Sequence, residues 1–145
     1  QMGLEDLLEQ APDTLSGGQT QRLAIASEIA FDPEFLIMDD PTSQMDPVGR
    51  KEFFEWLAGC SEKTIFIVSN EVDDLCEIAD QLWVLEKGEL IASGKPLDVI
   101  NQVAEGHDLY LPVVYRMAKE LGKKLPSGLF PVKLSELKRC FDDQN

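Results

Sequence analysis

Hydrophobic positions alternate along the chain between short continuous runs and helical spacings, which predicts an α/β fold. Apolar runs at residues 35–38 and 64–69 are short enough to be buried parallel strands. Two further runs flank a Glu-Lys-Gly-Glu turn and predict a β-hairpin at residues 82–85 and 90–92. Helices are predicted between these runs, at residues 2–10, 16–31, 47–58, 72–79 and 97–103.

The composition changes near residue 105. Apolar residues between Tyr110 and Leu121 recur at helical spacing, and a Gly/Pro-rich break follows at residues 122–131. A second short helix is predicted to start near Ser135. We interpret these two helices as packing helices that cap the domain, in preference to a ligand site.

The stretch Leu15-Ser16-Gly17-Gly18-Gln19 is a glycine-paired turn that opens the predicted helix at 16–31. Ser16 is a natural N-cap, and Gln19 stands three residues later, as in a capping box. The glycines let the backbone come close to a neighbouring group. Free N–H groups and the positive end of the helix dipole favour an anion, phosphate especially, although an ordinary capped helix has the same sequence pattern.

Asp39 and Asp40 follow the first apolar run directly, at the end where open α/β sheets place their ligands. Adjacent carboxylates there suit two tasks in phosphoryl transfer: one holds Mg²⁺, and the other orients an attacking water. A strand followed by an acidic turn without a metal is the alternative, and these two residues by themselves do not decide between them.

Charge and composition narrow the range of functions. The 145 residues carry a net charge of −14, which disfavours nonspecific binding to nucleic acid or anionic lipid. No apolar run approaches the roughly 20 residues that span a bilayer. Cys60, Cys76 and Cys140 lack metal-like spacing and fit a reduced, cytosolic compartment. His107 is the single histidine, so a His-based triad or zinc cluster is not available.

The glycine turn and the acidic pair, taken together in this order and at this spacing, form a pattern specific to one protein family. LSGGQTQRLAIASEIAFDPEFLIMDDPTSQMD closely resembles the signature helix, Walker B strand and D-loop of ATP-binding-cassette (ABC) ATPases. The resemblance implies a P-loop NTPase fold, of which residues 1–31 would end the signature subdomain and 32–104 would form the C-terminal part of the ATPase core. Residues 105–145, and Asp46 to Arg50, resemble energy-coupling-factor ATPases, the cobalt or vitamin importer group.

The resemblance also implies residue roles and cofactors, namely ATP and Mg²⁺. Asp39 would anchor Mg²⁺ through water, Asp40 stands at the position of the catalytic glutamate, and Asn70 stands at that of the switch-loop histidine. Asp46 would report across the dimer interface. The residues that would bind the γ-phosphate of ATP held by a partner subunit are Ser16, Gly17, Gly18 and Gln19.

Two departures from the family pattern bear on activity. Asp40 is one methylene shorter than glutamate, and Asn70 cannot carry a proton. We therefore expect this subunit to hydrolyse ATP weakly or not at all at its own site. No stretch matches the phosphate loop G-x-x-x-x-G-K-[ST], so the chain resembles the C-terminal portion of a cassette, and the isolated chain is not expected to bind ATP tightly.

The function expected from the resemblance is the ATP-binding subunit of an ABC-type importer. Its partners would be a second ABC ATPase subunit, identical or paralogous, and a transmembrane transporter subunit, with no nucleic acid. It would sit in the cytoplasm on the inner face of the membrane. Two alternatives stay open: a catalytically degenerate dimerisation partner of a sister ATPase, and a soluble ABC ATPase that acts on ribosomes or DNA.

Overall fold

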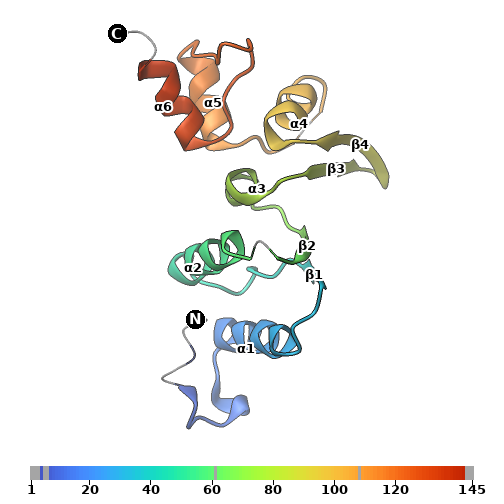
Figure 1. Cartoon of the computed structure of the whole chain (residues 1–145), viewed down its shortest axis with the longest axis vertical. Coiled ribbons are helices and arrows are strands. Elements are labelled where there is room, and N and C mark those ends of the chain that lie inside the picture. The colour runs from blue at the N-terminus through green and yellow to red at the C-terminus, as the bar shows by residue number, and fades with distance from the viewer. Residues whose placement is uncertain (1–3, 5–6, 61, 108, 143–145) are drawn as a thin grey trace. The chain divides into compact units, whose positions relative to one another are not determined.

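The computed structural model describes residue 4 and residues 7–60, 62–107 and 109–142. The chain forms two compact units, Gln1–Asn70 and Glu71–Asn145, and each is described by itself (Figure 1). No helix in the described residues is long and apolar enough to cross a membrane.

The first unit contains the two predicted parallel strands and the two long helices. Residues 2, 3, 5 and 6 of the predicted helix at residues 2–10 lie outside the described residues. Its described end is not an α-helix and forms a turn in which the Gln10 amide donates to the Leu7 carbonyl over 3.0 Å. The elements that follow in chain order are η2 (Pro12–Thr14), α1 (Gly17–Ala30), β1 (Phe35–Asp39), α2 (Pro47–Ala58) and β2 (Thr64–Val68).

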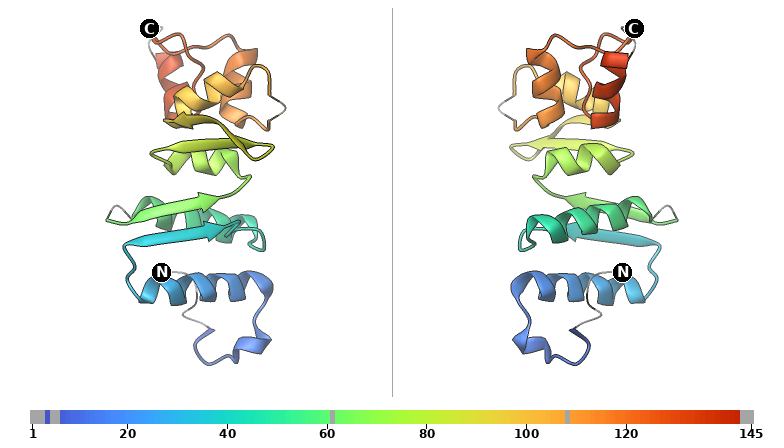
Figure 2. Two further views of the ribbon diagram at one scale, coloured as in Figure 1. Left: turned by 90° about the vertical axis from the view of Figure 1, so that its right-hand side faces the viewer. Right: turned by 90° about the vertical axis from the view of Figure 1, so that its left-hand side faces the viewer.

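Strands β1 and β2 pair in parallel, with Phe35 opposite Thr64 and Asp39 opposite Val68. Their carboxyl ends therefore lie at the same edge, as the sequence predicts. Helix α2 runs along one face of this strand pair (Figure 2). The residues that form the buried core of the unit are Ile25, Leu36, Met38, Phe53, Phe54 and Leu57.

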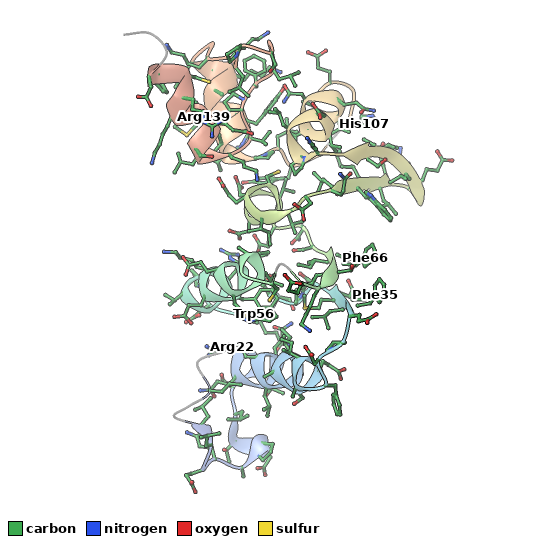
Figure 3. The ribbon with its side chains drawn as sticks, viewed as in Figure 1. Arg22, Phe35, Trp56, Phe66, His107 and Arg139 are labelled. Carbon is green, nitrogen blue, oxygen red and sulfur yellow. The ribbon has the colours of Figure 1, made fainter. Side chains whose placement is uncertain are left out.

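The prediction that both strands are buried is wrong within the described residues, since β1 buries one face and β2 only half-buries one. The exposed fractions are 65% for Phe35, 76% for Ile37, 43% for Phe66 and 62% for Val68. Successive side chains of a strand point to opposite faces, and the described part of this unit covers the face of Leu36 and Met38. Figure 3 shows Phe35 and Phe66 directed outward from β1 and β2.

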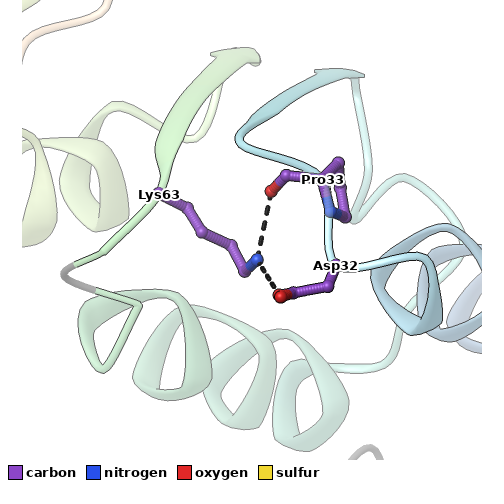
Figure 4. Close-up of polar contacts among 3 residues, drawn as sticks. All are labelled: Asp32, Pro33 and Lys63. Carbon is purple, nitrogen blue, oxygen red and sulfur yellow. Dashed lines mark hydrogen bonds and ion pairs between the residues drawn. The ribbon is translucent and has the colours of Figure 1, made fainter.

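A lysine joins the beginnings of the two strands (Figure 4). The Lys63 ammonium donates to Asp32 Oδ1 over 2.5 Å and to the Pro33 carbonyl over 3.0 Å. Asp32 has a left-handed backbone, φ 52°, which aspartate tolerates better than most residues. The Thr64 amide donates to the Glu34 carbonyl over 3.0 Å, so the ion pair lies next to the first backbone contact between the strands.

Replacing Lys63 by methionine is expected to lower the free energy of unfolding at pH 7 and to weaken its dependence on acid pH. The hydrogen bond and the charge of Lys63 lower the pKa of Asp32 below its ordinary 3.8. This stabilisation is therefore present above the ordinary pKa and is lost as pH falls through the lowered value. Urea unfolding at pH 7 and pH 3 measures both effects, and Lys51→Met, at the exposed Lys51–Glu55 pair, is the control. A Lys63→Met effect that is the same at both pH values would contradict the ion-pair interpretation.

In its described residues, the second unit contains a hairpin and four helices. Its elements are α3 (Val72–Ile78), β3 (Leu82–Glu86), β4 (Glu89–Gly94), α4 (Pro96–Val103), α5 (Val113–Glu120) and α6 (Leu134–Asp142). The antiparallel β3–β4 pair confirms the predicted hairpin. Its turn residues Lys87 and Gly88 both have positive φ, 51° and 85°, which matches the right-handed twist of the strands.

The core of the second unit joins α3, α4 and α5 to the segment before α6, through Cys76, Ile100, Tyr115 and Val132. Burial raises the pKa of the Cys76 thiol to about 12, so this cysteine is an inert packing residue. The Asn101 amide fixes the Gly/Pro-rich segment, because it accepts from the Phe130 N–H over 2.9 Å and donates to the Phe130 carbonyl over 2.8 Å.

Both predicted C-terminal helices are present, with different starts. The helical spacing included Tyr110, but α5 begins at Val113. Pro112 is its N-cap residue, and a proline disfavours helical backbone in the residue before it. Helix α6 begins at Leu134, one residue before the predicted start. Glu136 Oε2 accepts from the amides of Val132 and Lys133 over 2.9 and 3.0 Å, which satisfies amide groups at the start of this helix.

Candidate functional site

The beginning of α1 has the capping box that the sequence predicts. Ser16 is the N-cap, with extended backbone, φ −65° and ψ 161°. Its Oγ accepts from the Gln19 amide over 3.3 Å, and Gln19 Oε1 accepts from the Ser16 amide over 2.8 Å. The Thr20 amide donates to the Ser16 carbonyl over 2.8 Å and closes the first helical turn.

The first two amides of α1 stay available. Gly17 and Gly18 are the first two helical residues, whose N–H groups have no acceptor within a helix. No hydrogen bond among the described residues uses them. Ser16 is exposed, and its hydroxyl proton is free while the oxygen accepts from Gln19. This helix start can therefore donate three hydrogen bonds to an anion, with the helix dipole adding to the attraction.

The two glycines also have a packing role that the sequence reasoning did not anticipate. A Cβ on Gly18 would lie 2.7 Å from the Gln44 carbonyl oxygen, and a Cβ on Gly17 would meet the Gln44 side chain. Position 18 therefore needs glycine to let the turn at residues 40–45 approach α1, whereas at position 17 the end of the flexible Gln44 side chain could move aside. The sequence predicts close approach of a neighbouring group to these glycines, and within the described residues that group is the chain's own turn.

The acidic pair lies where the sequence predicts, at the carboxyl end of β1. Asp39 and Asp40 are both exposed. Asp40 has a left-handed backbone, φ 44°, and its amide donates to the Val68 carbonyl over 2.8 Å. Asn70 is also exposed and stands two residues after Val68. The parallel register therefore brings the ends that carry Asp39, Asp40 and Asn70 to one edge of the strand pair.

Asp46 is the N-cap of α2, as predicted. Its Oδ1 accepts from the Gly49 amide over 2.8 Å, and Pro47 occupies the first helical position. The carboxylate is exposed, so the same side chain remains accessible while it caps the helix. A role for Asp46 at a subunit interface stays a prediction.

The sequence reasoning missed Gln21. Its side-chain amide donates to the Asp40 carbonyl over 3.2 Å and accepts from the Gln44 amide over 3.2 Å. Its partners are separated from it by 19 and 23 residues, so nothing in local spacing identifies them. The signal that could have drawn attention to it is a glutamine on the same helix two residues after the glycine turn.

The described residues contain no group of three or more His, Cys, Asp or Glu side chains that could hold a metal ion by themselves. This still fits Mg²⁺, which is usually bound through one or two carboxylates together with the phosphates of a nucleotide and water. Asp39 offers such a carboxylate. The donors at the start of α1 are suited to the phosphate oxygens.

Comparisons with known proteins show which proteins this chain is similar to. A family model described as ABC transporter matches residues 1–43. The ATP-binding protein EcfA2 of an energy-coupling factor transporter from Streptococcus pyogenes serotype M28 is 40% identical over 139 residues, 92% of this chain and 50% of the relative. EcfA2 of serotype M5 is 39% identical over the same share. The chain spans about half the length of the curated relatives it matches.

A solved structure of an ABC transporter protein has a similar fold. CbiO1 from Clostridium perfringens, described as part of the ABC transporter complex cbiONQ, matches with a TM-score of 0.62 and 29% identity over 87% of this chain and 47% of that one. Parallel strands with flanking helices and a closing hairpin are therefore part of an ABC ATPase fold. Over the residues that it spans, the chain is similar to ABC transporter ATP-binding proteins of the energy-coupling-factor type.

Proposed function

We propose that this chain is part of an ATP-binding subunit of an energy-coupling-factor importer and that its α1 helix start binds the γ-phosphate of ATP held by a second ATPase subunit. The observation that carries the proposal is the exposed, capped glycine turn, with two unpaired amides at the start of a 14-residue helix. The similarity to EcfA2 proteins supports the transporter class.

The chemistry at this helix start is binding and orientation. The amides of Gly17 and Gly18 would donate to phosphate oxygens, and the Ser16 hydroxyl would add a third hydrogen bond. Gln19 would hold Ser16 in place, since the two side chains already cap each other's backbone. Because these donors are fixed before the phosphate arrives, little reorganisation is needed on binding.

The acidic edge would serve the chain's own nucleotide. Asp39 would hold Mg²⁺ through water, and the ion would offset negative charge on the phosphates. Asp40 would orient the attacking water, and Asn70 would donate to the γ-phosphate. Asp40 is shorter than the family's catalytic glutamate, and Asn70 replaces its switch-loop histidine. Hydrolysis at this site would therefore be slow. This favours a second candidate role, in which the chain mainly caps the ATP of a sister subunit.

The partners would be a second ABC ATPase and a membrane transporter subunit, and the subunit would lie against the cytoplasmic side of the membrane. The similar protein CbiO1 is part of an ABC transporter complex, which supports the same kind of assembly for this chain. ATP binding would draw the two ATPases together, and hydrolysis would release them, which would move the membrane subunit.

Ser16→Ala in the complete ATP-binding subunit, assembled with its partner ATPase and membrane subunit, tests this proposal. A hydrogen bond to a charged group contributes about 1.5–3 kcal/mol, so its loss should lower the ATPase rate of the complex about 10- to 100-fold. Ser27→Ala is the matched control, because Ser27 lies on the same helix and its hydroxyl donates to the Leu23 carbonyl over 2.9 Å.

The control variant should keep its ATPase rate within about twofold of wild type, because its hydroxyl lies far along α1 from the glycine turn. Loss of the Ser16 cap alone costs about 1 kcal/mol of stability, which thermal unfolding measures separately. Equal ATPase rates in the Ser16→Ala and Ser27→Ala complexes would refute the phosphate-binding role.

A further inference from the structure

Gln21 connects the two halves of the candidate site. Its amide nitrogen donates to the Asp40 carbonyl over 3.2 Å, and its amide oxygen accepts from the Gln44 N–H over 3.2 Å. Both partners are backbone groups, one an acceptor and the other a donor, so the orientation of the side-chain amide is fixed by its contacts. A glutamine is the uncharged side chain of this length that can satisfy both.

The turn that Gln21 holds, residues 40–45, is anchored to β2 at its first residue, where the Asp40 amide donates to the Val68 carbonyl over 2.8 Å. Within it, the Ser43 amide donates to the Asp40 carbonyl over 3.2 Å and the Met45 amide donates to the Thr42 carbonyl over 3.0 Å. The Thr42 hydroxyl is buried, yet it has no hydrogen-bond partner among the described residues. Asp40 itself has the left-handed backbone that connects β1 to the turn. Internal hydrogen bonds therefore leave the position of the turn against α1 undetermined.

Residues on either side of Gln21 lie close to the turn and to the helix that follows it. Gly18 lets the Gln44 carbonyl approach the helix start, as described above. One helical turn further along α1, an Arg22 guanidinium nitrogen lies 4.0 Å from where a Cβ of Gly49 would be, at the start of α2. Gln21 supplies the directional hydrogen bonds of this contact.

We propose that Gln21 is a positioning residue, which fixes the 40–45 turn, and with it the Asp40 backbone, against the helix that carries the glycine turn. The inference rests on the proposed function, because its consequence is for ATP hydrolysis. Gln21 touches neither nucleotide nor metal in this scheme. It acts by keeping the phosphate-binding helix start and the acidic edge in one geometry, where a displacement of about 1 Å can lower a rate about 100-fold.

Two substitutions separate the two hydrogen bonds. Gln21→Met is close in size to glutamine and removes both. Gln21→Glu keeps an acceptor for the Gln44 amide but places a negative charge against the Asp40 carbonyl. Gln102→Met, at an exposed position of α4, is the matched control, because it removes the same amide from a solvent-exposed helix face.

The first measurement is hydrogen exchange of the Gln44 amide in this chain, which does not depend on ATP. Exchange should become about 10-fold faster in Gln21→Met and stay near wild type in Gln21→Glu and Gln102→Met. Unchanged exchange in Gln21→Met would overturn the proposal, because the hydrogen bond would then not hold the turn.

The second measurement is ATP hydrolysis by the complete subunit in its assembled complex. Both Gln21 variants should lower kcat about 10-fold and change KM for ATP less than about twofold, because Gln21 orients residues without contacting ATP. An unchanged kcat in an active complex would overturn the positioning role. Absence of ATPase activity in the wild-type complex would instead refute the proposed function, and the hydrogen-exchange result would then still decide whether Gln21 fixes the turn.

Discussion

Asp40→Glu combined with Asn70→His in the complete subunit is expected to raise its steady-state ATPase rate about 100-fold. The added methylene moves the carboxylate toward the attacking water by roughly 1 Å, and a misplacement of that size can cost about 100-fold in rate. The imidazole of a histidine at position 70 can take up and release a proton, whereas the asparagine amide can only form hydrogen bonds. The two side chains lie at one edge of the β1–β2 pair, where the strand register brings them.

Because the backbone conformation of Asp40 affects how well glutamate fits at this position, the two single variants should be measured as well. Its φ is 44°, a left-handed conformation that suits aspartate better than glutamate. We therefore expect Asn70→His alone to show part of the increase, and the double variant to exceed the product of the single effects, because the two residues act on one water. Asp98→Glu, at an exposed position of α4, is the control for an added methylene. No increase in the double variant would contradict the idea that these two residues limit hydrolysis.

Much of the fold and of the site could be predicted from the sequence because the relevant signals are local. Ser16 and Gln19 are three residues apart, so the capping box follows from their spacing. Asp46 and Pro47 mark the beginning of α2 in the same way. The parallel strands follow from short apolar runs separated by a helix. The placement of Asp39 at the end of β1 then follows from the run alone.

The features that could not be predicted depend on contacts between distant segments. Gln21 forms its hydrogen bonds with a turn about 20 residues away in the sequence. Gly17 and Gly18 lie against Gln44 of the same turn. The sequence overestimates the burial of β1. A continuous apolar run is typical of a strand with both faces covered, but it does not show which residues would cover them. Phe35 and Ile37 are exposed for this reason. The roles of Asp39, Asp40, Asp46 and Asn70 toward ATP and Mg²⁺ remain predictions.

Phe53→Ala is expected to destabilise the first unit by about 3–5 kcal/mol, a large part of the 5–15 kcal/mol that holds a typical domain folded. The ring is 2% exposed and packs edge-on to Phe54, with centroids 5.6 Å apart, and beside Trp56, with centroids 6.0 Å apart. Its truncation would leave a cavity in the core of the first unit, which close packing prevents from refilling fully. Chemical unfolding, followed by the fluorescence of Trp56, measures the change.

Phe35→Ala is the matched control, because it removes the same ring from a site that is 65% exposed in β1. In this chain its effect should stay below about 1 kcal/mol, since little apolar area leaves the interior. The same pair of variants in the complete subunit gives a sharper test. If the outer face of β1 is covered there by other parts of the protein, the Phe35→Ala effect should rise toward that of Phe53→Ala, while the Phe53→Ala effect stays the same. Equal effects of the two variants in this chain would contradict the one-sided burial of β1.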